Sequence, residues 1–463
     1  MIGNISLSVV AQQYGGLILN GDAVIKSLSI DSRTLKSEQV FAAIKGPNFD
    51  GHDFAAKAAE AGISALVVER PSLELKTPQW VVSDCVKALG QIGSCCRDAF
   101  RQPVIGITGS SGKTSVKEML ASILRQRGEV LSTKGNFNNH LGVPLMLSEL
   151  SEEHAFAVLE MGASAVGEIA YLSGLVKPDV ALVNNVGTAH LEGFGSRQAI
   201  VQGKGEIYQS LTDAGRAVIN LDSYGAEDFL QQVSDQNSAQ VLTFSATGKA
   251  QADVKVSHVR IHDQGADYVL HSPLGDIDIS QSVLGLNNVA NGAAAATCAL
   301  AVGMRLDEIR NGLNQVGQVA GRLFSRQGIA GSWVLDDAYN ANPESMMGAI
   351  EVLANFDGKR IFVMGAMAEL GPEAESLHRG IGEKARAAGI EHMICVGEPT
   401  KTAASAFGSN ALWVESNDQA AQCCRELLGP KVVVLVKGSR SARLDEVVTQ
   451  ITNLEEPHAV LVN

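Results

Sequence analysis

The sequence predicts an α/β protein of three domains, and three observations support this fold class. The chain has 463 residues, whereas one domain usually takes about 100–200. From Pro103 onward, continuous apolar segments alternate with helical ones, as in parallel sheets covered by helices on both faces. A glycine-rich loop joins the first of these apolar segments to a helix. We place the domains at residues 1–85, 86–318 and 319–463.

The charge balance of the chain is acidic, with 37 Lys and Arg against 50 Asp and Glu and a net charge of −13. Nucleic acids and anionic membranes are bound by clustered cations, so this balance argues against nucleic-acid binding and a membrane anchor. Binding of a small anionic ligand remains compatible with this net charge, because a local site can be positive in a protein that is negative as a whole. The sequence has neither a signal-peptide pattern nor a run of about 20 apolar residues. We therefore expect a cytoplasmic protein with seven free cysteines.

The segments before residue 104 predict a small α/β domain and a connecting helix. The alanine-rich segment 53–62 has helical composition and ends in glycine. Residues 85–103 read as a helical connector that ends at Pro103, because the residue before a proline disfavours helix. Four apolar segments predict strands, at 24–30, 39–46, 64–69 and 79–84.

The rest of the chain predicts two further sheets. In the second domain, buried strands at 104–108, 155–162 and 179–187 belong to a mostly parallel sheet. Residues 251–284 alternate apolar with polar side chains, which predicts a small antiparallel appendage. A Rossmann-like, doubly wound sheet is predicted for the third domain, with strands at 332–339, 359–367, 391–397 and 431–439.

The segment Gly109–Thr114, with the sequence GSSGKT, is a candidate phosphate-binding loop. It follows a predicted strand and precedes a predicted helix, so backbone N–H groups and the helix N-terminus can surround phosphate oxygens. Lys113 would neutralise phosphate charge, and the Thr114 hydroxyl would bind magnesium. Ile107 stands where the common pattern has its first glycine, which leaves a plain glycine turn as the alternative.

Two side chains follow strands next to this loop. Glu160 ends one predicted strand, and His190 lies in the loop after another. Ligands of open α/β sheets bind at the carboxyl ends of strands, so both are candidate metal ligands. The alternatives are a solvated glutamate and a polar surface histidine. Lys204, on the next predicted helix, reads by itself as an exposed lysine.

The pair Asn288 and Asn291 is spaced i, i+3, so both amides share one helix face. They suit either a purine edge or the start of a helix. In the third domain, Arg322 lies near the boundary and Asp336–Pro343 follows a strand. Lys437–Arg440 ends another strand, where cations beside a glycine turn suit a carboxylate or phosphate; a basic turn is the alternative.

Together these motifs resemble the Mur ligase family, and the resemblance spans almost the whole chain. The N-terminal DSRTLKSEQVFAAIKGPNFDGHDFAAKAAEAG is similar to the uridine-nucleotide-binding domain of such a ligase. The other matching strings are TGSSGKTSVKEM, EMGA, NNVGTAHLEGFGS, GKGEIY, N-x-x-N before alanines, GRLF, DDAYNANPESM and LVKGSRSA.

The resemblance implies a domain for a UDP-sugar-peptide, a central ATP-binding domain, and a C-terminal domain that closes over ATP. It implies that ATP and Mg²⁺ drive amide synthesis through an acyl phosphate, with release of ADP and phosphate. The implied substrates are UDP-N-acetylmuramoyl-tripeptide and D-alanyl-D-alanine, as in peptidoglycan precursor synthesis. A monomer is expected.

The resemblance also implies roles for individual residues. Catalysis is expected from Lys113, Lys204, Glu160 and His190. Magnesium is expected at Thr114, Glu160, His190 and, if it is carbamylated, Lys204. ATP contacts are expected from Gly109, Ser110, Ser111, Gly112, Lys113, Thr114, Ser115, Asn288, Asn291, Arg322, Asp337, Tyr339 and Asn340. Substrate contacts are expected from Asp31, Ser32, Arg33, Lys45, Asn136, Asn138, Asn139, Lys437, Ser439 and Arg440.

Three features qualify the match. Asn287 stands where the family often has His, and Ala366 where Asp is common, so a role for the MAELG segment is open. The Asp-Asn-Pro-Arg string of the diaminopimelate-adding relative is absent. Two other functions remain as alternatives: a nucleotide-binding scaffold without turnover, and a ligase similar to folylpolyglutamate synthase.

Overall fold

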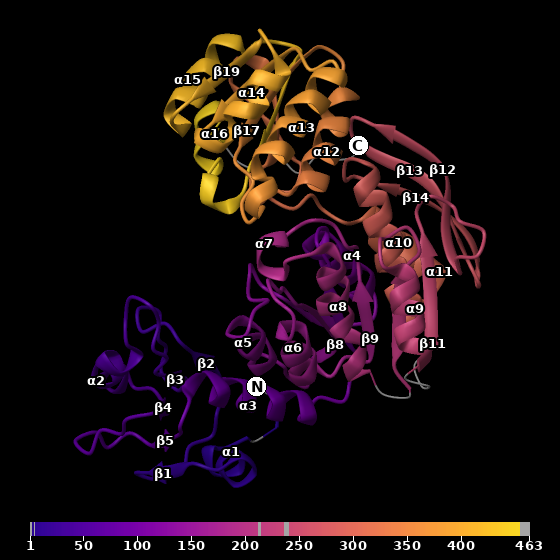
Figure 1. Ribbon diagram of the computed structural model, residues 1–463. Coiled ribbons are helices and arrows are strands. Elements are labelled where there is room, and N and C mark those ends of the chain that lie inside the picture. Colours follow the sequence, from indigo (N-terminus) through magenta and orange to yellow (C-terminus); the bar gives the residue numbers. More distant parts are fainter. Residues whose placement is uncertain (1, 4, 212–213, 236–239, 454–463) are drawn as a thin grey trace.

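The computed structural model describes residues 2–3, 5–211, 214–235 and 240–453. It contains three sheets, each in its own α/β unit along the chain (Figure 1). The N-terminal unit lies at one end, the unit with the nine-stranded sheet lies in the middle, and the C-terminal unit packs above it. The α/β fold class predicted from the sequence is confirmed.

The N-terminal unit is a five-stranded sheet in the order β1-β5-β4-β3-β2, in which only β1 runs antiparallel to its neighbour. Helix α3 begins at Cys85, where the Asp84 side chain accepts the N–H of Lys87 and caps the helix. The elements are α1 (Leu7–Tyr14), β1 (Leu17–Leu19), β2 (Leu28–Ser29), β3 (Val40–Ala42), η1 (Gly51–Phe54), α2 (Ala55–Glu60), β4 (Ala65–Val68), β5 (Gln79–Val81) and α3 (Cys85–Ala99).

The central unit is a nine-stranded sheet in the order β14-β13-β12-β11-β10-β9-β6-β8-β7. The strands from β7 to β12 are parallel, and β13 and β14 continue the sheet in antiparallel pairing. Of the appendage predicted at 251–284, the antiparallel pairing is confirmed for β12, β13 and β14 with one another, but β12 also joins β11 in parallel at two residue pairs. Its strands are β6 (Val104–Thr108), β7 (Glu129–Ser132), β8 (His154–Glu160), β9 (Val180–Val183), β10 (Arg216–Asn220), β11 (Gln240–Ser245), β12 (Val254–His262), β13 (Gly265–Ser272) and β14 (Gly275–Gln281). Its helices are α4 (Lys113–Leu124), α5 (Gly142–Ser148), α6 (Glu168–Val176), α7 (Leu191–Phe194), α8 (Arg197–Gly205), η2 (Glu206–Ser210), α9 (Ala226–Asp235), α10 (Leu286–Ala301) and α11 (Leu306–Asn314).

The buried strands of this sheet send alternate side chains into two different cores, as the period of two in a strand requires. In β9, Val180 and Leu182 pack into the core shared with α4, α10 and α11. Ala181 and Val183 pack on the opposite face, in a core that also takes in α3, α5 and α6. That second core continues into the N-terminal sheet through Val67 and Trp80. The N-terminal unit is therefore joined to the central one by apolar packing along α3.

The C-terminal unit is a six-stranded sheet in the order β15-β16-β20-β17-β18-β19, parallel except for β15. Its strands are β15 (Phe324–Gln327), β16 (Trp333–Asp337), β17 (Lys359–Gly365), β18 (His392–Val396), β19 (Ala411–Val414) and β20 (Val432–Lys437). Its helices are η3 (Ile329–Gly331), α12 (Pro343–Ala354), η4 (Gly371–Glu373), α13 (Ala374–Ala387), η5 (Glu398–Thr400), α14 (Lys401–Phe407), α15 (Asn417–Leu427), η6 (Arg440–Ala442) and α16 (Asp445–Ile451).

Several strands were not expected from the sequence, and four of them lie at sheet edges. β1 is an edge of the first sheet, β7 of the second, and β15 and β19 are the two edges of the third, whereas β10 and β11 lie inside the second sheet. An edge strand is partly exposed, so it needs less apolar sequence and carries a weaker periodic signal. No helix within the described ranges combines the length and the apolar character that a membrane span needs.

Candidate active site

The phosphate-loop candidate follows β6, the strand with β8 on one side and β9 on the other. This is the point at which strand order reverses, so a crevice opens beyond the carboxyl end of β6. Gly112 has a φ of +76°, which lets the chain turn directly into α4 at Lys113. The predicted strand, loop and helix are therefore all present at a position where open sheets bind ligands.

Two consecutive asparagines after β9 support this loop. The Asn185 Oδ1 accepts the N–H of Ser111 at 2.9 Å, and its Nδ2 donates to the Ser111 carbonyl at 3.1 Å. The Asn184 Nδ2 donates at 3.0 Å both to the Ser111 carbonyl and to Asn291 Oδ1. The Asn184 and Asn291 amides lie so close to Gly112 that a Cβ there would collide with both. The loop conformation thus depends on side chains from the segment after β9 and from α10.

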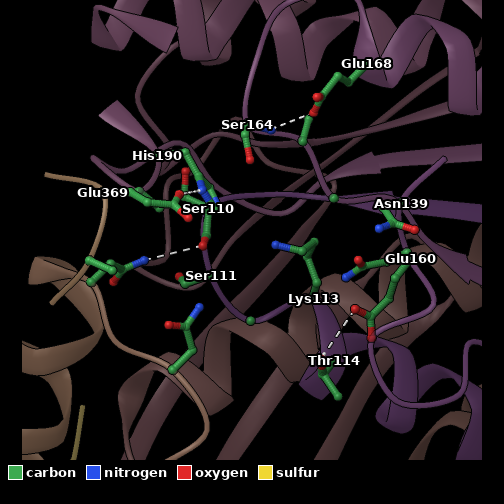
Figure 2. A pocket seen from close by; sticks show the side chains of 18 of the residues that line it. Ser110, Ser111, Lys113, Thr114, Asn139, Glu160, Ser164, Glu168, His190 and Glu369 are labelled. Atoms are coloured by element: carbon green, nitrogen blue, oxygen red, sulfur yellow. Dashed lines mark hydrogen bonds and ion pairs between the residues drawn. The ribbon is translucent and has the colours of Figure 1, made fainter. Parts of the chain in front are cut away.

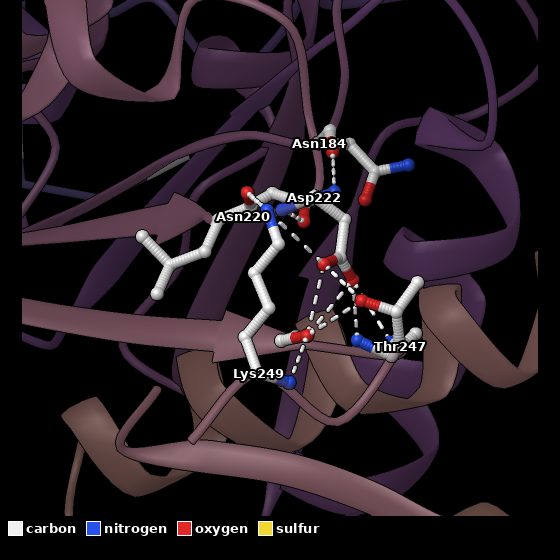
Figure 3. A network of polar contacts seen from close by, with 8 residues as sticks. Asn184, Asn220, Asp222, Thr247 and Lys249 are labelled. Atoms are coloured by element: carbon white, nitrogen blue, oxygen red, sulfur yellow. Dashed lines mark hydrogen bonds and ion pairs between the residues drawn. The ribbon is translucent and has the colours of Figure 1, made fainter. Parts of the chain in front are cut away.

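A polar network behind the loop connects it to β10 and β11 (Figure 3). The Asn220 Nδ2 donates to the Asn184 carbonyl at 2.8 Å, and Asn220 Oδ1 accepts the N–H of Asp222 at 2.9 Å. The Asp222 carboxylate accepts the Thr247 hydroxyl at 2.6 Å and the Thr247 N–H at 3.0 Å. Lys249 lies 3.7 Å from the same carboxylate. These bonds therefore tie together the carboxyl ends of β9, β10 and β11 beside the phosphate loop.

A cavity of about 740 Å³ opens above the loop, between the central and C-terminal units (Figure 2). The predicted site residues that line it are Ser110, Ser111, Gly112, Lys113, Thr114, Asn138, Asn139, Glu160, His190, Arg322, Tyr339 and Asn340. Residues from both units thus meet around one space large enough for a nucleotide-sized ligand.

Glu160 and Thr114 provide a pair of oxygen ligands in this cavity. The Thr114 hydroxyl lies 3.4 Å from Glu160 Oε2, whereas Glu160 Oε1 is buried without a hydrogen-bond partner in the described part of the chain. Its nearest cation is the Lys117 ammonium, at 3.8 Å. The described residues contain no cluster of three or more acidic, His or Cys side chains suited to a metal. This set fits magnesium, which uses one or two carboxylates and completes its shell with water and phosphate oxygens.

Two lysines lie near each other at the site, Lys113 in the cavity lining and Lys204 outside it. Burial lowers the pKa of the Lys113 amine, while nearby Glu160 opposes this shift and Arg322 adds to it. The Lys113 ammonium donates to the Gly109 carbonyl at 2.7 Å. Burial lowers the pKa of Lys204 well below its ordinary value, and Lys113 lowers it further. Lys204 is only 1% exposed, so the expectation of an exposed lysine from its local sequence is wrong.

His190 contacts the C-terminal unit. Its Nδ1 is hydrogen-bonded to the Glu369 carboxylate, in the loop after β17 (Figure 2). The Thr188 N–H and hydroxyl both donate to Glu344 Oε1, at 2.9 and 3.0 Å. Burial lowers the pKa of His190, and Glu369 opposes that shift. Residues 188–190 are thus bonded to two carboxylates of the other unit.

The remaining predicted nucleotide contacts differ in their relation to the cavity. Arg322 stacks on Tyr339, with its guanidinium carbon 4.3 Å from the ring centre, and both face the cavity. Asn288 and Asn291 are instead buried and bonded to each other, with Asn291 Nδ2 donating to Asn288 Oδ1 at 3.0 Å. Both lie within helix α10, so their amides stabilise the protein interior in this arrangement. Gly109 and Ser115 flank the cavity-lining part of the loop.

Asp337 and Lys437 form a buried ion pair below the cavity. The Lys437 Nζ donates to Asp337 Oδ2 at 2.6 Å and to the Asn340 carbonyl at 3.0 Å. Burial raises the pKa of Asp337 and lowers that of Lys437, while each charge opposes the shift of the other. The pair holds the loop after β16, which carries Tyr339 and Asn340 into the cavity.

We expect Lys437→Met to lower the free energy of unfolding of the C-terminal unit by about 3–5 kcal/mol, because it leaves Asp337 as an unpaired buried charge. The double variant Lys437→Met, Asp337→Leu should recover much of this loss. Urea unfolding followed by tryptophan fluorescence measures the effect, since Trp333 and Trp413 both lie in this unit. A double variant less stable than Lys437→Met would contradict the interpretation.

The predicted substrate residues are dispersed. Asn138 and Asn139 line the cavity, and Asn139 Oδ1 accepts the N–H of Gly142 at the start of α5 at 2.9 Å. Arg33 is paired with Asp31, which lowers the pKa of that carboxyl to about 2. The predicted substrate residues outside the cavity lining are Asp31, Ser32, Arg33, Lys45, Asn136, Lys437, Ser439 and Arg440.

Residues that the sequence did not single out also lie at the site. Asn184 and Asn185 support the phosphate loop, and Glu344 binds Thr188 beside the cavity. Those that line the cavity include Glu369, His140, Ser164, Glu168, Tyr171 and Ser345. The two asparagines and Glu344 lie within quoted motifs, and Glu369 lies in the MAELG segment. Ala366, the departure from the family directly before that segment, is buried only in part, and its carbonyl accepts the N–H of Ser439 at 2.9 Å. Because Asn184 and Asn185 directly follow a predicted strand, their position could have suggested a place at the site. Glu344 and Glu369 contact residues of the other unit, so the local sequence around them gives no sign of that role.

Comparison with known families finds three matching models. The Mur ligase middle domain matches residues 107–299, the Mur ligase glutamate ligase domain matches 321–440, and the Mur ligase family catalytic domain matches 24–93. The model of the middle domain covers the phosphate loop, Glu160, His190 and Lys204.

Relatives match over nearly the whole chain. The UDP-N-acetylmuramoyl-tripeptide–D-alanyl-D-alanine ligase of Escherichia coli strain K12 is 40% identical, across 96% of this chain and 98% of that protein. A crystal structure of MurF from Acinetobacter baumannii is 34% identical with a TM-score of 0.90, covering 97% of this chain and 98% of that one. MurF from Thermotoga maritima, solved with ADP, is 29% identical with a TM-score of 0.81, covering 92% and 96%. The chain therefore belongs to the Mur ligase family.

Proposed function

We propose that this protein is an ATP-dependent ligase that joins D-alanyl-D-alanine to UDP-N-acetylmuramoyl-tripeptide in peptidoglycan precursor synthesis, and releases ADP and phosphate. The observation that carries the proposal is the cavity in which Lys113, Glu160 and His190 meet residues of the C-terminal unit. Relatives named for this reaction supply the substrates. Residues 1–85 would bind the UDP-sugar-peptide, 86–318 would bind ATP, and 319–463 would complete the site.

The reaction needs an activated acid, because a carboxylate has no good leaving group. Transfer of the γ-phosphoryl group of ATP to the peptide carboxylate forms a P–O bond and gives an acyl phosphate and ADP. The neutral amine of D-alanyl-D-alanine attacks the carbonyl carbon, and the tetrahedral intermediate expels phosphate as the amide forms. Both steps depend on positioning and on charge stabilisation.

The phosphate loop supplies most of that stabilisation. Residues 109–115 would direct backbone N–H groups at the phosphates, with the α4 N-terminus behind them. Lys113 would neutralise charge on the transferred phosphoryl group. Without a ligand, burial disfavours the charged form of Lys113. A bound phosphate would favour that charged form, and the ammonium would in turn neutralise charge on the phosphate. Arg322, Tyr339 and Asn340 would contact the nucleotide from the C-terminal unit. The buried residues Asn288, Asn291 and Asp337 would hold the structure around the nucleotide, or would contact the nucleotide after a rearrangement.

Magnesium would be held by Thr114, Glu160 and His190, and it would neutralise phosphate charge and polarise the transferred group. Glu160 is suited to this role because its unpartnered oxygen is buried beside the loop. Lys204 would contribute after carbamylation, in which its neutral amine attacks carbon dioxide and loses a proton. The lowered pKa of Lys204 favours the neutral amine that this step requires. The carbamate would then add a carboxylate-like ligand for magnesium.

Water must be excluded while the acyl phosphate exists, because it hydrolyses. Bonds between the central and C-terminal units at Thr188 and His190 support a site that closes between them. The incoming substrates would be held by Asn136, Asn138 and Asn139 and by Arg440, whereas Lys437 and Ser439, which are buried, would hold the loops around them. Asp31, Ser32, Arg33 and Lys45 would hold the uridine end. We expect a cytoplasmic monomer.

The test is a coupled assay of phosphate release. Release should need ATP, magnesium, UDP-N-acetylmuramoyl-tripeptide and D-alanyl-D-alanine together, and EDTA should abolish it. Comparing tripeptides that end in lysine and in diaminopimelate identifies the third residue. UDP-N-acetylmuramoyl-tripeptide should raise Tm and folate should not. Phosphate release that is indifferent to the dipeptide would contradict the proposal.

A further inference from the structure

The loop after β9 is held by the C-terminal unit at two points. Glu344, at the start of α12, accepts two hydrogen bonds from Thr188. It also lies so close to Gly187 that a Cβ there would be 2.9 Å from the Glu344 carboxyl carbon. Glu369 is bonded to His190 through its carboxylate, and its carbonyl accepts the N–H of Glu192 at 3.4 Å.

The bond between His190 and Glu369 determines which imidazole nitrogen carries the proton. An ionised carboxylate accepts hydrogen bonds but donates none, so the proton of a neutral ring lies on Nδ1. The lone pair is then on Nε2, which has no hydrogen-bond partner among the residues that the structure describes. Metal-binding histidines are commonly oriented in this way by a carboxylate on the other nitrogen.

Both members of this pair have left-handed backbones, which side-chain-bearing residues rarely adopt. His190 has a φ of +61° and Glu369 a φ of +59°. Such conformations cost on the order of 1–3 kcal/mol each and persist where the surroundings enforce them, commonly at functional sites. Two such residues, on loops of different units, meet at one hydrogen bond. That coincidence is unexpected for an incidental surface contact.

We infer that Glu369 is a positioning residue for the metal ligand His190, supplied across the domain interface, so that the metal site is complete only when the C-terminal unit is docked. The inference rests on the proposed function, because it requires a divalent cation at His190. It gives the MAELG segment a role that does not depend on the aspartate that is common in the family at the position of Ala366. It also makes cation affinity depend on domain docking.

The experiment measures binding of Mn²⁺, as a probe for magnesium, to the full chain with ADP by electron paramagnetic resonance. Glu369→Ala should weaken Mn²⁺ binding by about tenfold or more. Glu369→Gln should have a smaller effect, because its amide oxygen still accepts from Nδ1. Glu373→Gln is the matched control, since this glutamate is exposed in the same connection and should leave the affinity unchanged.

The tautomer of His190 gives a second readout, which would stay unchanged in the Glu369 variants if Glu369 had only a structural role. Nitrogen-15 spectra of histidine-labelled protein, assigned with His190→Ala, should show the Nδ1–H form of His190. Glu369→Ala should shift the ring toward a mixture of tautomers. Thermal unfolding of each variant excludes misfolding as the cause.

The outcomes separate the two levels of the proposal. If wild-type protein binds no Mn²⁺ with ADP, or if His190→Ala binds it as well as wild type, the metal assignment in the proposed function fails. If His190→Ala weakens binding whereas both Glu369 variants match wild type in affinity and tautomer, only the role of Glu369 is overturned. Weakened binding in Glu369→Ala with partial rescue in Glu369→Gln supports it.

Discussion

Lys113→Ala should lower kcat for phosphate release by about 10³-fold, the largest effect that we expect from one side chain. Lys113 is the first residue of α4. Nearby Glu160 raises the pKa of its ammonium, whereas nearby Arg322 lowers it. Removing one preorganised charge from a phosphoryl-transfer site typically costs on the order of 10²–10⁵-fold. Steady-state phosphate release at saturating substrates measures the loss.

Lys87→Ala is the matched control for this variant. Lys87 is exposed on α3, outside the cavity lining, and its replacement should leave kcat unchanged. Circular dichroism should show the same fold for both variants. Full turnover by Lys113→Ala would remove the phosphate loop from the mechanism, and with it the proposed ligase.

Gly112→Ala should weaken ATP binding by about 100-fold. The new Cβ would lie 2.6 Å from Asn184 Nδ2 and would also collide with Asn291 Oδ1. The φ of +76° adds a backbone penalty of about 1 kcal/mol. Overpacking costs about 1–3 kcal/mol more, and the loop can relieve both only by moving away from its ligand-binding shape. Titration calorimetry with a nonhydrolysable ATP analogue measures the affinity.

Gly303→Ala separates the two causes of that effect. Gly303 has a similar φ of +80°, but nothing lies within 4 Å of its Cβ position, and it is remote from the loop in the turn between α10 and α11. It should lose about 1 kcal/mol of stability and keep wild-type ATP affinity. If Gly112→Ala binds the analogue as tightly as Gly303→Ala does, the asparagine support of the loop is refuted.

The local features of the site were predictable from the sequence. The strand β6, the loop 109–112 and the helix α4 are contiguous, so their apolar run, glycines and helical composition lie in one window. The strands of the parallel sheets are buried on both faces, and they therefore appear as continuous apolar segments. Because the carboxyl ends of parallel strands share an edge, Glu160 and His190 could also be placed at one cavity before the structure was known.

Lys204 and the pair His190 and Glu369 mark the limit of sequence reasoning. The composition of helix α8 predicts an exposed lysine, whereas the folded structure buries it, with its ammonium over the Phe194 ring of α7. His190 and Glu369 are 179 residues apart, and Lys437 and Asp337 are 100 apart. Periodicity and spacing describe neighbours in the chain, so they determined the elements and the type of site. Which charges are buried, and which partner each one meets, was decided only by the tertiary structure. Pairing of β16 with β20 inside the third sheet brings Asp337 to Lys437, whereas His190 meets Glu369 only where the central and C-terminal units pack together. Burial and pairing of this kind depend on distances that folding alone creates.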